Sequence, residues 1–232
     1  MADSSPIARS PIRQAPPEVV VAAWSVSAKT SISPLRLIDC TPCQKTLLRT
    51  DASSAAARSL RVDRGRARRD GSGMIAAGIG PNEWIMISPP GAPVPPAIRQ
   101  TSDGPAPSTV VDLTHARALI RIAGADSAKV LTKLCGINFS DSATPNGTAL
   151  RTSIARLVTE VIRIDLFERP AGTPDPGGPT RSYLIMCERS AAQYLFDRLL
   201  DAGQEFGIDI EGFGAVASTT SSDTARRVES AR

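Results

Sequence analysis

Cys40 and Cys43 are separated by two residues, a spacing found in redox pairs and in half-sites for zinc. Zinc in structural sites has about four protein ligands, and the chain has no second cysteine pair and only one histidine. A redox pair needs a helix N-terminus that stabilises the thiolate, whereas these cysteines are expected in a turn between strands. We therefore interpret them as two small residues in a hairpin and predict no metal site.

His115 is the only side chain that titrates near neutral pH, so ordinary acid–base chemistry would depend on it. Asp112 precedes it by three residues and could orient the imidazole ring. No Gly-x-Ser-x-Gly motif supplies a nucleophile, although a distant Ser or Cys could still converge on the histidine. A structural histidine at a strand end is favoured over a catalytic one, and no catalytic residue is predicted.

A cluster of arginines, interleaved with Asp63 and Asp70, is the strongest charge feature of the chain. Its members are Arg58, Arg61, Arg64, Arg66, Arg68 and Arg69. Phosphates or a carboxylate-rich partner would be attracted to it. Aromatic residues are nearly absent around it and no nucleic-acid-binding motif accompanies it, so a solvated loop or a subunit contact is favoured. No Gly-x-Gly-x-x-Gly or P-loop motif points to a bound dinucleotide or ATP.

The chain of 232 residues has 41% hydrophobic residues, which is enough for a packed core. Its net charge of +4 comes from the N-terminal half, because residues 1–107 contain 13 Lys and Arg against 8 Asp and Glu, whereas residues 108–213 contain 11 against 13. No apolar run approaches the roughly 20 residues that span a bilayer, and the N-terminus does not fit a secretory signal. We expect a cytoplasmic protein with reduced thiols and no membrane contact.

Residues 1–33 are rich in Ser, Pro and Ala and are expected to form a flexible N-terminal arm. Residues 34–213 are expected to form a single domain, followed by a disordered tail at 214–232. Seven prolines between residues 89 and 108 indicate a linker or surface loop that is neither helix nor inner strand. A long hairpin loop is expected at 169–181.

Alternating apolar residues predict strands, and apolar residues at helical spacing predict helices. The predicted strands are 35–39, 45–50, 74–79, 84–87, 109–114, 118–122, 149–155, 158–167, 183–187 and 208–213. The predicted helices are 52–60, 126–134 and 190–206, the last with a capping box of Ser190 and Gln193. This order predicts an α+β fold, an antiparallel sheet with helices packed on one face, and strands on both sides of the proline-rich loop are expected to share that sheet.

Five blocks in the same order resemble the gamma subunit of heterotetrameric sarcosine oxidase. They are residues 80–84, 111–117, 120–124, 146–153 and 194–207, and the match runs from about Leu35 to Phe213. The resemblance implies a relative of the folate-binding aminomethyltransferase fold. It also implies a place in a four-chain enzyme that oxidises sarcosine to glycine and forms H2O2, with the one-carbon unit passed to tetrahydrofolate or released as formaldehyde.

In that family the flavins FAD and FMN, NAD and tetrahydrofolate are expected on partner chains, and zinc on the smallest one. The resemblance therefore implies alpha, beta and delta partner subunits and a gamma chain that is non-catalytic by itself and binds no cofactor of its own. Residues 203–205 are similar to a Gly-Gln-Glu signature in another branch of the superfamily, but the cysteine before that signature has no counterpart, and Gln204 and Glu205 are expected to face solvent. The alternatives are a stand-alone folate-binding or one-carbon-transfer protein and, third, a nucleic-acid binder that uses Arg58 to Arg69.

Overall fold

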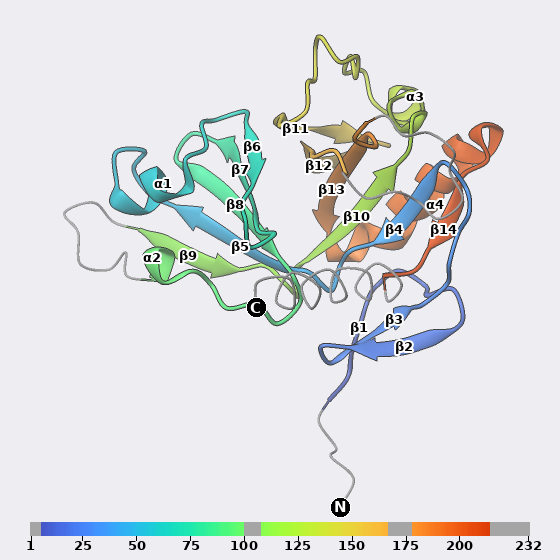
Figure 1. Cartoon of the computed structure of the whole chain (residues 1–232), viewed down its shortest axis with the longest axis horizontal. Helices are drawn as coiled ribbons and strands as arrows, with labels where there is room; N and C mark the ends of the chain where they lie inside the picture. Colours follow the sequence, from blue (N-terminus) through green and yellow to red (C-terminus); the bar gives the residue numbers. More distant parts are fainter. Residues whose placement is uncertain (1–5, 100–107, 167–177, 214–232) are drawn as a thin grey trace, which may run out of the picture.

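The computed structural model describes residues 6–99, 108–166 and 178–213. The tail predicted to be disordered, 214–232, lies outside these residues, as does most of the loop predicted at 169–181. The described strands form two main sheets and a small third sheet (Figure 1).

The larger sheet has six strands in the order β11-β12-β13-β10-β4-β14. Neighbouring strands are antiparallel except β14, which is parallel to β4. Its strands are β4 (Arg36–Asp39), β10 (Arg117–Ala123), β11 (Ala149–Ile154), β12 (Leu157–Arg163), β13 (Ser182–Glu188) and β14 (Asp209–Glu211).

The second sheet has five antiparallel strands in the order β6-β7-β8-β5-β9. Its strands are β5 (Gln44–Arg49), β6 (Ala67–Arg69), β7 (Ile75–Gly80), β8 (Glu83–Ser88) and β9 (Thr109–Asp112). The prediction of one shared sheet is therefore wrong. The chain passes from the six-stranded to the five-stranded sheet between β4 and β5, and it returns between β9 and β10. At each of these two crossings, strands that are consecutive in sequence therefore belong to different sheets.

The two sheets pack against each other, and helices cover their outer faces. One apolar cluster lies between the six-stranded sheet and helices α3 (Ser127–Leu134) and α4 (Ala192–Gly203). A second cluster joins the two sheets, and a third lies between the five-stranded sheet and helices α1 (Ala55–Leu60) and α2 (Pro96–Arg99). Strands hold more of the described residues than helices do, and each main sheet carries helices on one face only, because its other face is covered by the opposite sheet.

Helix α4 confirms the predicted apolar stripe, since Ala192, Leu195, Phe196 and Leu199 are buried. The predicted capping box is absent. A 3-10 turn, η2 (Arg189–Ala191), precedes the helix, so the N-cap position falls on Ala191, which makes no side-chain cap hydrogen bond. A second 3-10 turn, η3 (Gln204–Phe206), follows the helix and ends at Gly207, whose φ of 67° is left-handed.

The N-terminal segment differs from the flexible arm expected for residues 1–33. Residues 8–27 contain three strands, β1 (Ala8–Arg9), β2 (Glu18–Val21) and β3 (Trp24–Ser27), in a small sheet of order β1-β3-β2. Trp24 and Val26 are buried in the cluster between the main sheets, and Ile12 is buried in the cluster beneath α3 and α4. Burial of these side chains provides the energy that orders the segment.

The described part of the proline-rich segment contains the short helix α2, although we expected neither a helix nor an inner strand there. Proline is tolerated at the first position of a helix, where its missing N–H has no partner in any case, and Pro96 occupies that position. Ile98 is buried beneath the five-stranded sheet and anchors the turn. Among the described helices, none is long and apolar enough to cross a membrane; the longest, α4, has 12 residues.

Candidate functional site

The two crossings between the main sheets lie side by side, at residues 40–43 and 113–116, and we call this region the crossover corner. The backbone N–H of Cys40 donates to the carbonyl oxygen of Leu119 at 2.8 Å. The backbone N–H of Lys45 donates to Oγ1 of Thr114 at 3.1 Å, and that of Leu113 donates to the carbonyl oxygen of Lys45 at 2.8 Å. The structure therefore brings together the two cysteines and the histidine loop, which are about 70 residues apart in sequence.

Lys45 holds the first crossing in place from inside the protein. Its side chain is fully buried, and Nζ donates to the carbonyl oxygens of Thr41 and Cys43 at 2.6 and 2.7 Å. Burial lowers the pKa of Lys45 to about 8, although neighbouring Cys43 and Asp39 oppose this shift. Sequence reasoning missed this residue, because a single lysine at the start of a strand resembles a solvent-exposed charge.

Lys45→Met is expected to change how stability depends on pH. Above pH 8 the folded chain loses the Lys45 proton, whereas the unfolded chain keeps it up to the ordinary pKa of 10.5. The unfolded state then binds more protons, so the free energy of unfolding contributed by Lys45 rises with pH, by at most about 3 kcal/mol across this interval. Urea denaturation at several pH values should show wild type gaining stability relative to Lys45→Met between pH 8 and 10.5. The account is contradicted if the gap stays constant or if Lys129→Met, at an exposed site, gives the same slope.

The cysteine turn does not have the properties of a redox pair. The backbone N–H of Cys43 donates to the carbonyl oxygen of Cys40 at 3.0 Å, which closes a tight turn, and both thiols are free. Burial raises the pKa of both thiols above the ordinary value of 9.0. The turn position agrees with the sequence prediction, but the hairpin interpretation is wrong because the flanking strands, β4 and β5, belong to different sheets.

An open hollow of about 510 Å³ lies beside the crossover corner. The imidazole ring of His115 is exposed and stacks on the indole of Trp24, with ring centroids 4.9 Å apart and planes within 9° of parallel. Ala22 and Ala23 form the turn that precedes Trp24 in the chain, and their φ values of 47° and 63° are left-handed. The remaining lining comes from Pro6, Ile7, Ala8, Pro42, Gln44, Gly91, Asp112 and Thr114.

Asp112 supplies the negative charge of this hollow. Partial burial raises the pKa of its carboxyl, but hydrogen bonds from Thr114 and the charges of His115 and Lys45 outweigh that effect, so the net shift is downward. The backbone N–H of Thr114 donates to Oδ1 at 2.8 Å. In the described part of the chain, no hydrogen bond joins this carboxylate to His115.

The lining of the hollow combines apolar and polar groups, as small-molecule binding sites do. It offers an aromatic stack, one imidazole and one carboxylate, while the neighbouring thiols are held in their protonated form. Sequence reasoning found His115 and Asp112 and missed Trp24, because the stack joins two residues that are 91 positions apart in sequence. Among the described residues, no three His, Cys, Asp or Glu side chains are grouped to hold a metal ion.

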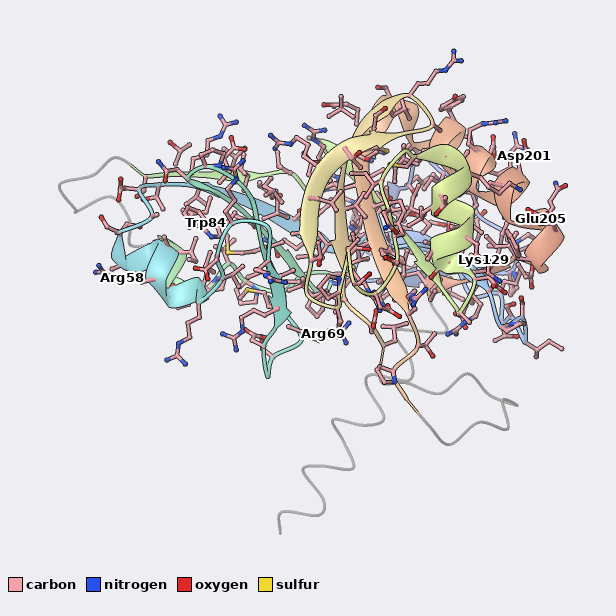
Figure 2. The ribbon with its side chains drawn as sticks, turned by 90° about the horizontal axis from the view of Figure 1, so that it is seen from above. Arg58, Arg69, Trp84, Lys129, Asp201 and Glu205 are labelled. Carbon is pink, nitrogen blue, oxygen red and sulfur yellow. The ribbon has the colours of Figure 1, made fainter. Side chains whose placement is uncertain are left out.

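The arginine cluster lies elsewhere, on the five-stranded sheet and helix α1. Figure 2 shows Arg58 on α1 at the opposite end of the molecule from Asp201 and Glu205. Five of its six members, Arg58, Arg61, Arg64, Arg66 and Arg68, are exposed and form no ion pair within the described residues. Gln204 and Glu205 are also exposed, as predicted, and Glu205 pairs with Lys133 at 2.7 Å.

A buried ion pair that the sequence did not reveal lies at the end of β12. The guanidinium of Arg163 donates to both carboxylate oxygens of Asp165, at 3.1 and 3.0 Å, and to the carbonyl oxygen of Thr144 at 2.6 Å. Asp165 also accepts from the backbone N–H of Ser182, and Asp141 from Arg163 and Arg181. These bonds tie the loop after α3 to the sheet.

This arrangement of sheets and helices is an aminomethyltransferase-like fold, in agreement with the fold implied by the sequence resemblance. A chain of heterotetrameric sarcosine oxidase from Corynebacterium sp. U-96, solved in complex with pyrrole 2-carboxylate, matches with a TM-score of 0.58 and 21% identity, over 77% of this chain and 89% of that one. Glycine cleavage system aminomethyltransferase T from Bartonella henselae matches with a TM-score of 0.61 and 12% identity, over 86% of this chain and 56% of that one. At such identities the likeness shows a shared fold. No protein-family model and no curated protein sequence matches the chain.

Proposed function

We propose that this chain is a gamma-type accessory subunit of a heterotetrameric sarcosine oxidase. The observation that carries the proposal is the extent of the structural match. This chain spans 89% of a chain from such an enzyme, whereas it spans only 56% of aminomethyltransferase T. The likeness to the oxidase chain therefore extends to its size as well as its fold, and the five sequence blocks favour the same assignment.

In the proposed assembly this chain binds no flavin, NAD or zinc and performs no chemical step. The assembly converts sarcosine to glycine and reduces O2 to H2O2, and the one-carbon unit passes to tetrahydrofolate or leaves as formaldehyde. FAD, FMN, NAD, tetrahydrofolate and zinc are assigned to the alpha, beta and delta subunits. Burial holds the thiols of Cys40 and Cys43 in the protonated form, which supports a role for this chain that does not use thiol chemistry.

Exposed apolar side chains on the small N-terminal sheet support a role in assembly. Ile7 and Val20 are 54% and 59% exposed, and Val19 is 39% exposed. Successive residues of a strand face opposite sides of its sheet, so Val19 and Val20 leave an exposed apolar side chain on each side of β2. We place a partner contact at this small sheet.

Co-expression of this chain with the products of neighbouring genes tests the proposal. Affinity purification through a tag on this chain is expected to recover three further chains, two of them large, which mass spectrometry identifies. The proposal fails if the tagged chain purifies alone as a stable monomer under conditions in which the neighbouring products are expressed and folded.

A stand-alone folate-binding protein is the second candidate, favoured by the hollow beside His115 and Trp24. Its volume of about 510 Å³ lies in the range of small-molecule sites. Calorimetric titration of the isolated chain with tetrahydrofolate separates the two candidates. Heat of binding that is lost in His115→Ala would favour the stand-alone protein, and no heat of binding would rule it out.

A further inference from the structure

The segment from Arg58 to Asp70 contains six arginines against two aspartates, a net charge of +4, which equals the net charge of the whole chain. We call the surface formed by Arg58, Arg61, Arg64, Arg66 and Arg68 the arginine face. We propose that the arginine face binds an acidic segment of a partner protein, with Arg58, Arg61 and Arg64 receiving its carboxylates. This inference concerns a binding chemistry of the isolated chain and does not depend on the proposed sarcosine oxidase assembly.

Asp70 and Glu83, which lie nearby in sequence or on the adjoining hairpin, are committed to other contacts, whereas Asp63 is exposed and lines the hollow beside the arginine face. Asp70 accepts hydrogen bonds from Ser72 and Met74 within its own turn. Glu83, on the β7–β8 hairpin, pairs with Arg49 at 2.8 Å and with Arg151 at 3.2 Å. The guanidinium groups of the arginine face therefore have their hydrogen-bonding capacity available to a partner.

The backbone beneath the arginine face is held rigidly. The indole N–H of Trp84 donates to the carbonyl oxygen of Val62 at 3.0 Å, and the N–H of Gly65 donates to the carbonyl oxygen of Gly78 at 2.8 Å. At Gly78 an added Cβ would lie 2.5 Å from the carbonyl oxygen of Asp63, so the loop rests directly on strand β7. A surface whose backbone is already fixed loses less entropy on binding.

A hollow of about 560 Å³ opens between helix α1 and the β7–β8 hairpin. Arg58, Arg61 and Arg64 line it together with apolar atoms of Val62 and Pro81. Guanidinium groups bind carboxylates in bidentate fashion, and the apolar atoms suit the methylene groups of a glutamate side chain. The mixed lining therefore fits an acidic peptide better than a bare phosphate chain.

One observation disfavours a nucleic acid as the occupant. Trp84, the aromatic residue of the hollow, is only 6% exposed, so it offers no ring on which a base could stack. Charged side chains on an edge strand can prevent it from pairing with another chain, and this role can account for Arg68, because β6 is an edge strand. It does not account for Arg58, Arg61 and Arg64, which lie outside β6.

The test compares two charge-reversal variants of the full chain, with folding checked by circular dichroism. Arg58→Glu, Arg61→Glu and Arg64→Glu together reverse the charge of the three members of the arginine face that line the hollow. The matched control reverses three exposed arginines that form no ion pair within the described residues, namely Arg9, Arg13 and Arg156. Both variants carry the same net charge, so any difference between their affinities for the peptide comes from where the substituted arginines lie. The probe is a fluorescein-labelled oligoglutamate peptide, followed by fluorescence anisotropy at low salt.

We expect the wild-type chain to bind the peptide, the triple variant to bind about a hundredfold more weakly, and the control to stay close to wild type. Unlabelled oligothymidylate with the same number of negative charges should compete less well than unlabelled peptide. Equal weakening in both variants, stronger competition by the oligonucleotide, or no binding of the peptide to the wild-type chain would each overturn the proposal.

Discussion

Arg163→Met is expected to lower the free energy of unfolding by about 3–5 kcal/mol, because it leaves the carboxylate of Asp165 buried without its partner. Both side chains are only 7% exposed. Burial lowers the pKa of Arg163, but hydrogen bonds to Asp165 and Asp141 outweigh this effect and raise the pKa, so the charged pair is retained on folding. Thr144 would lose its donor as well, which frees the loop after α3.

Urea denaturation of Arg163→Met and Arg198→Met measures this effect against a control. Arg198 pairs with Asp201 at 3.1 Å on the exposed face of α4, and such a surface pair contributes at most about 1 kcal/mol. Adding Asp165→Asn to Arg163→Met should recover part of the loss, since it removes the isolated charge. The buried-pair account is wrong if Arg163→Met is no more destabilising than Arg198→Met.

Leu119→Ala has the second large expected effect, a loss of about 2–5 kcal/mol. Leu119 lies on β10 with no exposed surface, in the apolar cluster that joins the two main sheets. Truncation would leave a cavity between two sheets that are each paired along their own strands and cannot readily close it. Val158→Ala on β12, where the side chain is 68% exposed, is the control and should change stability by less than about 0.5 kcal/mol.

Thermal and urea denaturation of these two variants would test the sheet packing directly. If Leu119→Ala is as stable as Val158→Ala, the six-stranded and five-stranded sheets do not share the core described above. A loss confined to Leu119→Ala would support the packing between the main sheets on which the crossover corner depends.

Local sequence patterns predicted where the helices and strands lie better than they predicted which strands pair with each other. Helix α4 was predictable because its apolar residues recur at helical spacing, and α3 and most strands were predictable for similar local reasons. The assignment of β4 and β5 to different sheets was not, because strand pairing depends on contacts between residues far apart in sequence, such as Ile38 with Arg121 and Leu47 with Val111. Strand β7 is buried on both faces, so its sequence has no alternation that would show which sheet it joins.

The candidate site was predictable only in part, for the same reason. His115 and Asp112 could be selected by residue type, because few other side chains offer acid–base chemistry. The stack on Trp24 and the position of Lys45 beneath the cysteine turn depend on how distant segments meet. The N-terminal segment illustrates the point, because its Ser, Pro and Ala content is typical of a flexible arm while two of its apolar side chains, Trp24 and Val26, belong to the core between the sheets.

The most direct test of the central proposal, that this chain is an accessory subunit of a sarcosine-oxidising assembly, is the absorbance of the material that co-purifies with it. The account predicts a yellow, flavin-containing complex of four chains whose flavin absorbance is bleached when sarcosine is added in the absence of O2, while the isolated chain is colourless. A colourless, stably monomeric chain that recovers no flavoprotein from cells expressing its gene neighbours would contradict the account.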